Sequence, residues 1–586
     1  MKKIMNQPEN MVSEMCQGMM MAHGELTFIR KYKVIMKKEL AKNKVSLISG
    51  GGSGHEPTHG GFVGQGMLDA AVCGDVFASP SQVQIYQAIK ATASDKGTLL
   101  IIKNYSGDVM NFKNAAYLAT EEGLAVDYVL VDDDIAVEDS LYTVGRRGVA
   151  GTLFVHKIAG AAAERGQCLT EVKAVAQKAI KNVRSIGFAF TSCTVPAAGK
   201  PTLDLQENEL EYGVGIHGEP GIRREVVKPS KELADRMTKA ILEALDIRVG
   251  YTGEVAVLVN GFGGTPLQEL YVLNHDIMEV LHQADIKVRG VFVGNYMTSL
   301  EMAGASLSIL KLDDELTERL FDESTAPGFS VSKKPELVAY QPALQEVTSN
   351  EMSFEVVSDA SWAEIKDNEV TLHNMKFMID KMSEVIIKNE ALFCELDAHA
   401  GDGDFGMSLA KGFRQLKREW AEITRPEIAT IGEFLAECSM IIMEHCGGAS
   451  GPIWGSAFRH AGIAVGEQAS LTTVAFAQML QAAVHGIQAT GAHAFGRGAV
   501  VGDKTLMDAL IPCADLWTAE ADKGSDFVTI FKLGAEAAVA GAKRTKEMVA
   551  QMGRASTVGE RSIGHPDAGA YGLGVIFTEI ANALRS

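Results

Sequence analysis

Positive charge is scarce in this sequence. Its 586 residues include 55 Lys and Arg against 74 Asp and Glu, which gives a formal net charge of −19 at pH 7. Because affinity for a phosphate backbone depends on an excess of basic residues, we expect no nucleic-acid partner. The sequence also lacks an apolar run of about 18 residues, the length that a spanning helix needs, so we expect no membrane partner.

Paired cysteines are lacking as well. The eight cysteines are scattered, and no two of them form a CxxC pair. This distribution favours reduced thiols over a disulfide framework or a zinc site. The opening residues MKKIMNQPENM carry two lysines with no apolar segment behind them, which is not the pattern of a secretory signal. Together these features predict a cytoplasmic protein.

Short β-branched runs alternate with amphipathic segments over roughly the first 320 residues. Several of these runs are apolar on both faces, which is typical of a covered sheet in an α/β fold. We predict strands at Val45–Ser49, Thr98–Ile102, Val126–Val131, Gly187–Phe190, Val255–Val259 and Val288–Val293.

Strand signals nearly vanish after a proline-containing stretch at 326–367. Beyond it, apolar residues recur at the spacing of a helix with one buried face, as in Met375, Met378, Ile379, Met382 and Ile386. Similar patterns lie at 430–445, 472–488 and 528–550. We therefore expect α/β subdomains at 1–182 and 183–325, a linker at 326–367 and an all-α domain at 368–586.

A glycine-rich segment, Ser49-Gly-Gly-Gly-Ser-Gly-His55-Glu-Pro57, follows the first predicted strand. Its glycines expose backbone N–H groups and let the chain approach an oxygen-rich ligand closely. His55 is placed to hydrogen-bond a substrate hydroxyl, although a tight turn with a satisfied histidine explains the same pattern. No Gly-Lys-Ser/Thr follows, so the segment is not a Walker A loop.

Two further segments carry candidate chemistry. Lys103 and Asp108 come at the end of an apolar strand, which is where open α/β sheets bind ligands. They offer a cationic anchor and a base for a ligand, but an ion pair within the loop explains them equally well.

His217 is flanked by glycines in Gly213–Gly221, which suggests open approach paths to its ring. A neutral imidazole can act as a nucleophile, a base or a metal ligand, but a lone histidine is usually none of these.

Three carboxylates are crowded in Asp397-Ala-His-Ala-Gly-Asp402-Gly-Asp404, at the end of the first helix predicted after the linker. Such groups repel one another unless a cation neutralises them. Mg²⁺ would be held in this way, with phosphate oxygens completing its octahedron. A solvated acidic turn explains the same crowding, and an EF-hand is excluded because no glutamate closes a twelve-residue loop.

Three more glycine clusters lie downstream, at 447–451, 496–505 and 553–556. In an all-α domain, glycine-rich helix starts beside a Mg²⁺ loop are anion cradles. Arg554 would compensate charge on a transferring phosphate.

Taken together, these motifs resemble the single-chain, ATP-dependent dihydroxyacetone (glycerone) kinase family over nearly the whole chain. SGGGSGHEP, KNYSGDVMNF and GIHGEPG are similar to the substrate-binding half of that family. LDAHAGDGDFG, GGASG, GDKTLMDAL and GRAS are similar to the nucleotide-binding half.

The resemblance implies a role for each matched residue. His217 would hold the ketose as a covalent hemiaminal, Asp108 would be the base, and His55 would assist it. Mg²⁺ ions bridging the ATP phosphates would be held by Asp397, Asp402 and Asp404. The ketose site would be formed by Gly52, Ser53, Gly54, His55, Lys103 and Asp108, and the nucleotide site by Phe405, Gly406, Met407, Ser450, Gly498, Thr505, Leu506 and Arg554.

The resemblance further implies an α/β substrate-binding region of two subdomains followed by an all-α nucleotide-binding helical barrel, in a homodimer. The expected reaction transfers phosphate from ATP to dihydroxyacetone. Erythrulose or another short-chain ketose is an alternative substrate. The same motifs are compatible with a phosphotransferase-system component that keeps ADP bound, and with a regulator that binds ketose without catalysis.

Overall fold

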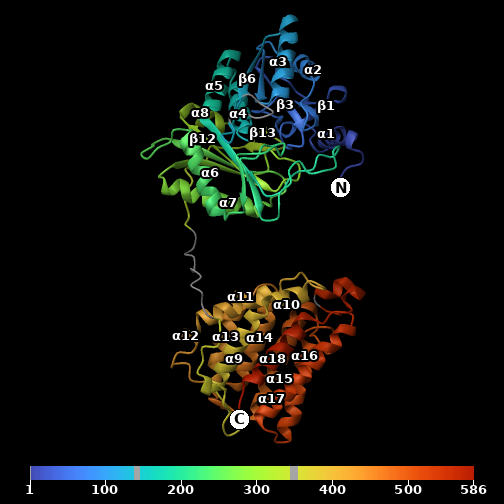
Figure 1. The fold of residues 1–586 in the computed structure, drawn as a ribbon, viewed down its shortest axis with the longest axis vertical. Coiled ribbons are helices and arrows are strands. Elements are labelled where there is room, and N and C mark those ends of the chain that lie inside the picture. Colours follow the sequence, from blue (N-terminus) through green and yellow to red (C-terminus); the bar gives the residue numbers. More distant parts are fainter. Residues whose placement is uncertain (1, 138–144, 343–353, 553) are drawn as a thin grey trace. The chain divides into compact units, whose positions relative to one another are not determined.

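The computed structural model describes residues 2–137, 145–342, 354–552 and 554–586. The chain divides into two compact units, Met1–Gln345 and Glu346–Ser586 (Figure 1). Within the described residues, the first unit combines two mixed sheets and a short hairpin with helices, and the second is helical apart from one short strand pair. The fold class predicted from the sequence, α/β followed by all-α, is confirmed.

The first sheet has the order β1-β2-β4-β3-β5-β6, with β3 to β6 parallel to one another. Alternate residues of its central strands face two separate cores, which explains their apolar sequences. Helices α2 (Gln82–Thr92) and α3 (Ser106–Glu121) cover one face. The strands are β1 (Leu26–Ile29), β2 (Val34–Lys37), β3 (Ser46–Ser53), β4 (Ala70–Val76), β5 (Thr98–Lys103) and β6 (Val126–Val131).

The second sheet has the order β11-β10-β12-β7-β8-β9. Helices α6 (Ser230–Ala244) and α7 (Leu267–Gln283) cover one of its faces. The strands are β7 (Val183–Ala189), β8 (Glu209–Tyr212), β9 (Arg223–Val226), β10 (Glu254–Gly261), β11 (Lys287–Gly294) and β12 (Gly304–Leu312).

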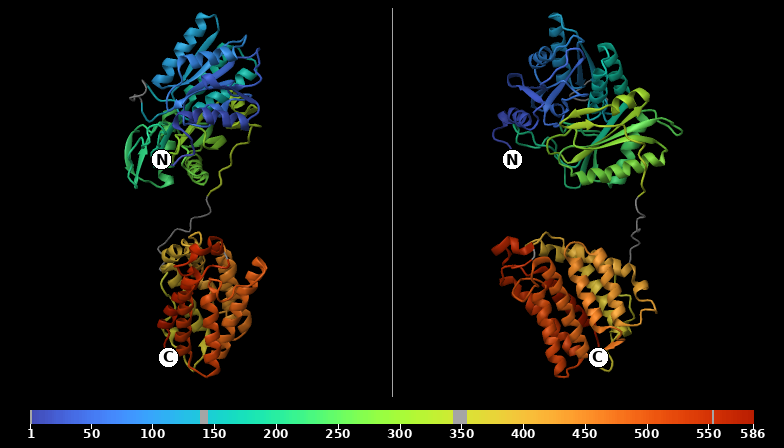
Figure 2. Two further views of the ribbon diagram at one scale, coloured as in Figure 1. Left: turned by 90° about the vertical axis from the view of Figure 1, so that its right-hand side faces the viewer. Right: turned by 180° about the vertical axis from the view of Figure 1, so that it is seen from behind.

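One hydrophobic core joins the two sheets of the first unit. It collects side chains from strands of both sheets together with the helices packed between them (Figure 2). The helices between the sheets are α4 (Thr152–Glu164), α5 (Leu169–Asn182) and α8 (Asp314–Phe321), and α1 (Met11–Ala22) adds side chains to the same core from its place against β1 and β4. A hairpin of β13 (Ser324–Ala326) and β14 (Phe329–Val331) follows, so ordered structure enters the segment that the sequence suggested as a linker.

In the described part of the second unit, eight helices form a closed ring. Each contacts the next along the chain, and α18 returns to α9. The Met and Ile stripe predicted for 375–386 is buried on α9, and the ring encloses an apolar cavity of about 120 Å³. The helices are α9 (Leu372–Lys388), α11 (Phe405–Arg418), α13 (Ile431–His445), α14 (Ser450–Val465), α15 (Thr473–Phe495), α16 (Met507–Asp522), α17 (Phe527–Arg544) and α18 (Ala568–Ala583).

Smaller elements of this unit include α10 (Glu390–Asp397), α12 (Trp420–Ile423), short 3-10 segments and the pair β15 (Val370–Thr371) with β16 (Ser470–Leu471). Within the described residues, none of the helices combines the length and the apolar character required to cross a bilayer.

Candidate functional site

The carboxyl ends of two neighbouring parallel strands bring the first group of candidate residues together. Lys103 is the last residue of β5, and Asp108 lies in the first turn of α3, which follows it. Lys103 Nζ is 3.0 Å from Asp108 Oδ2, and the two side chains are only 1% and 4% exposed. Ser79 donates a hydrogen bond to the other carboxylate oxygen. The pair is therefore a buried and hydrogen-bonded ion pair, not a surface contact.

Gly51 of β3 makes room for this pair, and Gly52 and Gly54 make room for the neighbouring segment at Phe77 and Ala78. A Cβ at Gly51 would lie 2.6 Å from Lys103 Nζ, and a Cβ at Gly52 would lie 2.7 Å from the backbone nitrogen of Ala78. Gly54 has a φ of +103°, and a Cβ there would lie 2.9 Å from the ring of Phe77. Glycine is therefore required here by close approach and, at Gly54, also by backbone conformation.

Four rings from distant parts of the sequence converge beside the ion pair. His55 stacks on Phe77 with ring centroids 5.1 Å apart. His217, from the segment between β8 and β9, meets His55 edge to face at 4.9 Å and Phe77 at 5.0 Å. Tyr105 contacts the ring of His217 at 4.8 Å. The structure thus brings together His55 and His217, which are 162 positions apart in the sequence.

The hydrogen-bonding state of His55 is fixed by its surroundings. Its ring is completely buried, and Nδ1 lies 2.8 Å from the carbonyl oxygen of Thr298, to which only an N–H can donate. Burial lowers the pKa of His55 well below its usual range, and His217 and Lys103 lower it further. Nε2 has no partner among the described residues. This nitrogen therefore carries a free lone pair that can accept a hydrogen bond from a ligand hydroxyl.

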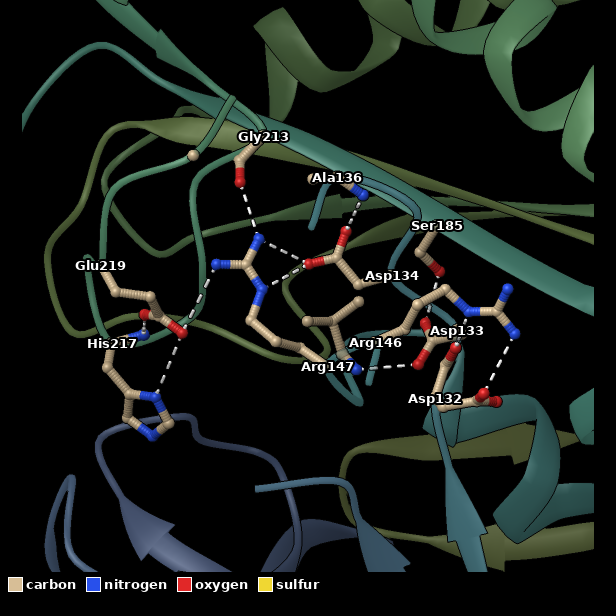
Figure 3. Close-up of polar contacts among 12 residues, drawn as sticks. Asp132, Asp133, Asp134, Ala136, Arg146, Arg147, Ser185, Gly213, His217 and Glu219 are labelled. Atoms are coloured by element: carbon tan, nitrogen blue, oxygen red, sulfur yellow. Dashed lines mark hydrogen bonds and ion pairs between the residues drawn. The ribbon is translucent and has the colours of Figure 1, made fainter. Parts of the chain in front are cut away.

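His217 is accessible, with a side chain that is 22% exposed. Its neighbour Glu219 is buried, contacts Arg147, and faces the imidazole (Figure 3). The sequence suggested that glycines around His217 keep its ring open to approach. Instead, a Cβ at Gly215 would lie 2.0 Å from the carboxyl carbon of Glu219, so this glycine accommodates the carboxylate.

The second unit holds the acidic cluster. Oxygen atoms of Asp397, Asp402 and Asp404 lie within 4.8 Å of one another. Asp397 Oδ2 accepts hydrogen bonds from the backbone N–H groups of Gly403 at 2.9 Å and Asp404 at 3.1 Å. Asp397 ends α10, which is the second α-helix in the described part of this unit and not the first, because α9 stops at Lys388. A set of hard oxygen donors this close together fits Mg²⁺.

A cavity of about 230 Å³ adjoins the acidic cluster. Among its lining residues are Ser450, at the N-terminus of α14, and Lys504, which belongs to the GDKTLMDAL motif but was assigned no role from the sequence. Lys504 Nζ donates to the backbone carbonyls of His565 at 2.9 Å and Met548 at 3.2 Å, so it holds one wall in place. Of the residues predicted to contact nucleotide, the cavity is lined by Phe405, Ser450, Thr505 and Leu506.

Other predicted nucleotide residues lie elsewhere or are not described. A Cβ at Gly406 would lie 2.1 Å from the carbonyl oxygen of Glu390, so Gly406 serves helix packing. Gly498 packs in the same way against Gln488, and Met407 is exposed. The backbone of Arg554 belongs to a 3-10 segment, but its side chain is outside the described part, as is Gly553.

Asp567 also lines the cavity, and the sequence assigned it no role, although it ends the His-Pro-Asp segment that resembles the nucleotide-binding half of the family. Its carboxylate accepts a hydrogen bond of 2.7 Å from the N–H of Ala570 and caps α18. Desolvation raises the pKa of Asp567 to about 7, and the negative charge of Asp508 contributes to the rise.

Comparison with known proteins gives a consistent result over both units. Residues 17–328 match the model of the Dak1 domain and residues 399–582 match that of the DAK2 domain. The chain is 52% identical to the dihydroxyacetone-binding subunit DhaK of a PTS-dependent dihydroxyacetone kinase of Listeria innocua, over 54% of this chain and 95% of that protein. It is 33% identical to L-erythrulose 1-kinase of Mycolicibacterium smegmatis, over 100% of both chains.

A solved structure covers both units as well. The dihydroxyacetone kinase of C. freundii, in complex with AMP-PNP and Mg²⁺, is 30% identical to this chain. It matches with a TM-score of 0.61 over 99% of each chain.

Proposed function

The chain belongs to the dihydroxyacetone kinase family and is a kinase of that family, and on that premise we propose that it phosphorylates dihydroxyacetone with ATP. The observation that carries the proposal is the convergence of His217, His55 and the Lys103–Asp108 pair. His217 offers an accessible imidazole, His55 an acceptor nitrogen without a partner among the described residues, and Asp108 a buried carboxylate. Together these groups suit a small molecule with one carbonyl and several hydroxyls.

We propose that His217 holds the ketose through its carbonyl. Nε2 attacks the carbonyl carbon, a C–N bond forms, and the electron pair of the C=O bond moves to oxygen, which takes up a proton. The ring loses its Nδ1 proton to restore neutrality, so the adduct is a neutral hemiaminal. Glycerol, which has no carbonyl, cannot form this bond. His217→Ala is therefore expected to abolish the adduct and most discrimination against glycerol, measured by intact mass and by competition kinetics.

The phosphoryl acceptor would be activated by Asp108. Its carboxylate takes the proton of the attacking hydroxyl while the oxygen forms a bond to the γ-phosphorus and the bond to ADP breaks. Lys103 holds the carboxylate in place, and Nε2 of His55 accepts a hydrogen bond from a ketose hydroxyl. We assign the ketose contacts to Gly52, Ser53, Gly54, His55, Lys103 and Asp108.

In the second unit, Asp397, Asp402 and Asp404 would hold Mg²⁺, which neutralises charge on the ATP phosphates. Ser450 and Thr505 line the adjoining cavity and can donate hydrogen bonds to phosphate oxygens. Contact with the nucleotide stays a prediction for Gly406, Met407, Gly498 and Arg554. The homodimer is also a prediction, and sedimentation equilibrium would test it.

The proposal also names the preferred substrate among the short-chain ketoses. Erythrulose adds one hydroxymethyl group to dihydroxyacetone, and the relative from Mycolicibacterium smegmatis is an L-erythrulose 1-kinase. We expect a higher kcat/KM for dihydroxyacetone than for erythrulose when both are assayed with ATP and Mg²⁺. A preference of about tenfold or more for erythrulose would reverse the assignment.

A second candidate is a component that keeps ADP bound and is rephosphorylated by a carrier protein. It is favoured by the 52% identity of the first half to a PTS-dependent dihydroxyacetone-binding subunit. The presence of both domains in one chain favours direct use of ATP instead. Multiple turnovers by the purified chain with ATP and Mg²⁺ alone would support the first proposal, and product formation only after addition of phosphocarrier proteins would support the second.

A further inference from the structure

Glu219 lies behind the imidazole of His217, on the same short loop. Its side chain is only 3% exposed. Oε2 accepts a hydrogen bond of 2.8 Å from the backbone N–H of His217, and Oε1 lies 3.7 Å from Nδ1 of the same residue. One carboxylate therefore fixes the backbone of His217 and also faces one particular nitrogen of its ring (Figure 3).

Two other groups converge on Oε1 of Glu219. The hydroxyl of Tyr105 donates to it at 3.3 Å, and Nη1 of Arg147 lies 3.7 Å away. Arg147 is itself immobilised, because its guanidinium binds Asp134 at 2.7 Å and the carbonyl oxygen of Gly213 at 2.7 Å. Its side chain is completely buried. Arg147 thus faces the carboxylate from a fixed position, and Tyr105 adds a hydrogen bond to it.

The charge on this carboxylate is maintained despite its burial. Desolvation acts to raise the pKa of Glu219, but the contacts with His217 and Arg147 outweigh it and lower the pKa to about 2. At neutral pH the group facing Nδ1 is therefore an acceptor that carries a full negative charge. An acceptor of this kind favours the tautomer in which the proton resides on the nitrogen facing it.

We propose that Glu219 is a positioning residue that keeps the proton of neutral His217 on Nδ1, so that Nε2 presents its lone pair to the ketose carbonyl. Arg147 keeps Glu219 in place. The inference rests on the proposed function, in which Nε2 of His217 forms the bond to the ketose. While that bond forms, the ring carries a positive charge until its Nδ1 proton leaves, and the adjacent carboxylate stabilises this charge.

The test measures the tautomer of His217 directly, without ketose. Two-bond ¹H–¹⁵N correlations of ¹⁵N-histidine-labelled full-length protein distinguish the two tautomers, and the signals of residue 217 are those missing from His217→Ala. The Nδ1–H form is expected in the native protein. In Glu219→Gln the amide can donate to Nδ1, so we expect the Nε2–H form to dominate and KM for ketose to rise about tenfold or more, with KM for ATP unchanged.

Glu211→Gln is the matched control. Glu211 is a buried carboxylate of the same region, and it accepts a hydrogen bond of 2.8 Å from the N–H of Gly221, at the far end of the loop. If loosening of the loop were the cause, Glu211→Gln would have the same effect as Glu219→Gln. We expect it to keep the native tautomer, and Glu219→Asp, which retains the charge, to restore it in part. An unchanged tautomer in Glu219→Gln would overturn the inference.

A second pair of variants covers the case in which Glu219→Gln does not fold. Arg147→Lys keeps the charge but loses the planar guanidinium that bonds both Asp134 and the carbonyl oxygen of Gly213. Because Glu219 is then held less firmly, KM for ketose should rise severalfold. Arg146→Lys alters the adjacent arginine, which pairs with half-exposed Asp132, and should leave KM unchanged. Equal behaviour of the two variants would count against the inference. Failure of the native protein to form any ketose adduct, with its Nδ1–H tautomer intact, would instead refute the proposed function.

Discussion

Replacing Lys103 by methionine should destabilise the first unit strongly. The substitution retains the length of the side chain but leaves the carboxylate of Asp108 buried without its cation, since the two groups are 3.0 Å apart and 1% and 4% exposed. Breaking one partner of such a pair costs about 3–5 kcal/mol. Since domains are typically stable by about 5–15 kcal/mol, this loss is a large fraction of the total.

Urea unfolding can separate this effect from any change in the second unit. The chain has four tryptophans, at 362, 420, 454 and 517, and all of them belong to the second unit. Far-UV circular dichroism follows both units, whereas tryptophan fluorescence follows the helical one. We expect Lys103→Met to move part of the dichroism transition to lower urea and to leave the fluorescence transition in place.

Two controls make the reasoning refutable. Lys90 pairs with Glu122 at 2.9 Å on the surface of the same unit, so Lys90→Met should have no measurable effect on the transition. Adding Asp108→Leu to Lys103→Met removes the orphaned charge and should recover part of the stability. If Lys103→Met lowered the unfolding free energy by less than about 1 kcal/mol, the pair would not be the desolvated contact described here.

Three further predictions concern activity, metal binding and pH. Asp108→Asn should reduce kcat by about 10²-fold or more with little change in KM for ATP, and near-native kcat would remove Asp108 from the role of base. Asp397→Asn should weaken Mg²⁺ binding in titration calorimetry, because Asp397 contributes to the oxygen cluster and orders the loop, and unchanged affinity would refute this. Glu219 has a pKa lowered to about 2, so its stabilisation is present above the ordinary value near 4.5 and is lost as pH falls toward 2. Glu219→Gln should therefore flatten the acid limb of the stability profile, and an unaltered limb would contradict the assignment.

Several of the predicted strands are buried on both faces, whereas Val126–Val131 and Val288–Val293 are partly exposed. The segment Thr98–Ile102, for example, is apolar from Leu99 onward and lies inside β5, where every residue is buried. Strands β1 and β2 escaped detection because they have only four residues each, and β9 because it is a polar edge strand with a mostly exposed pattern. The sequence of β4 includes Gly74 and Asp75, which weaken a strand signal.

The candidate site was predictable where its residues are close together in the sequence. The acidic cluster needs only a short loop, so its motif was sufficient. In contrast, Phe77 and Tyr105 meet His217 only because segments distant in the sequence converge, and no local pattern reports that. Glycine motifs were ambiguous for a physical reason. The same absence of a Cβ serves ligand approach or close packing, and at Gly406 and Gly498 the structure shows packing.

The most direct measurement is a steady-state assay of the purified chain with ATP, Mg²⁺ and dihydroxyacetone, with no other protein present. We predict formation of dihydroxyacetone phosphate and ADP in equal amounts over many turnovers. ATP hydrolysis without ketose phosphorylation, or no turnover at all, would contradict the central claim.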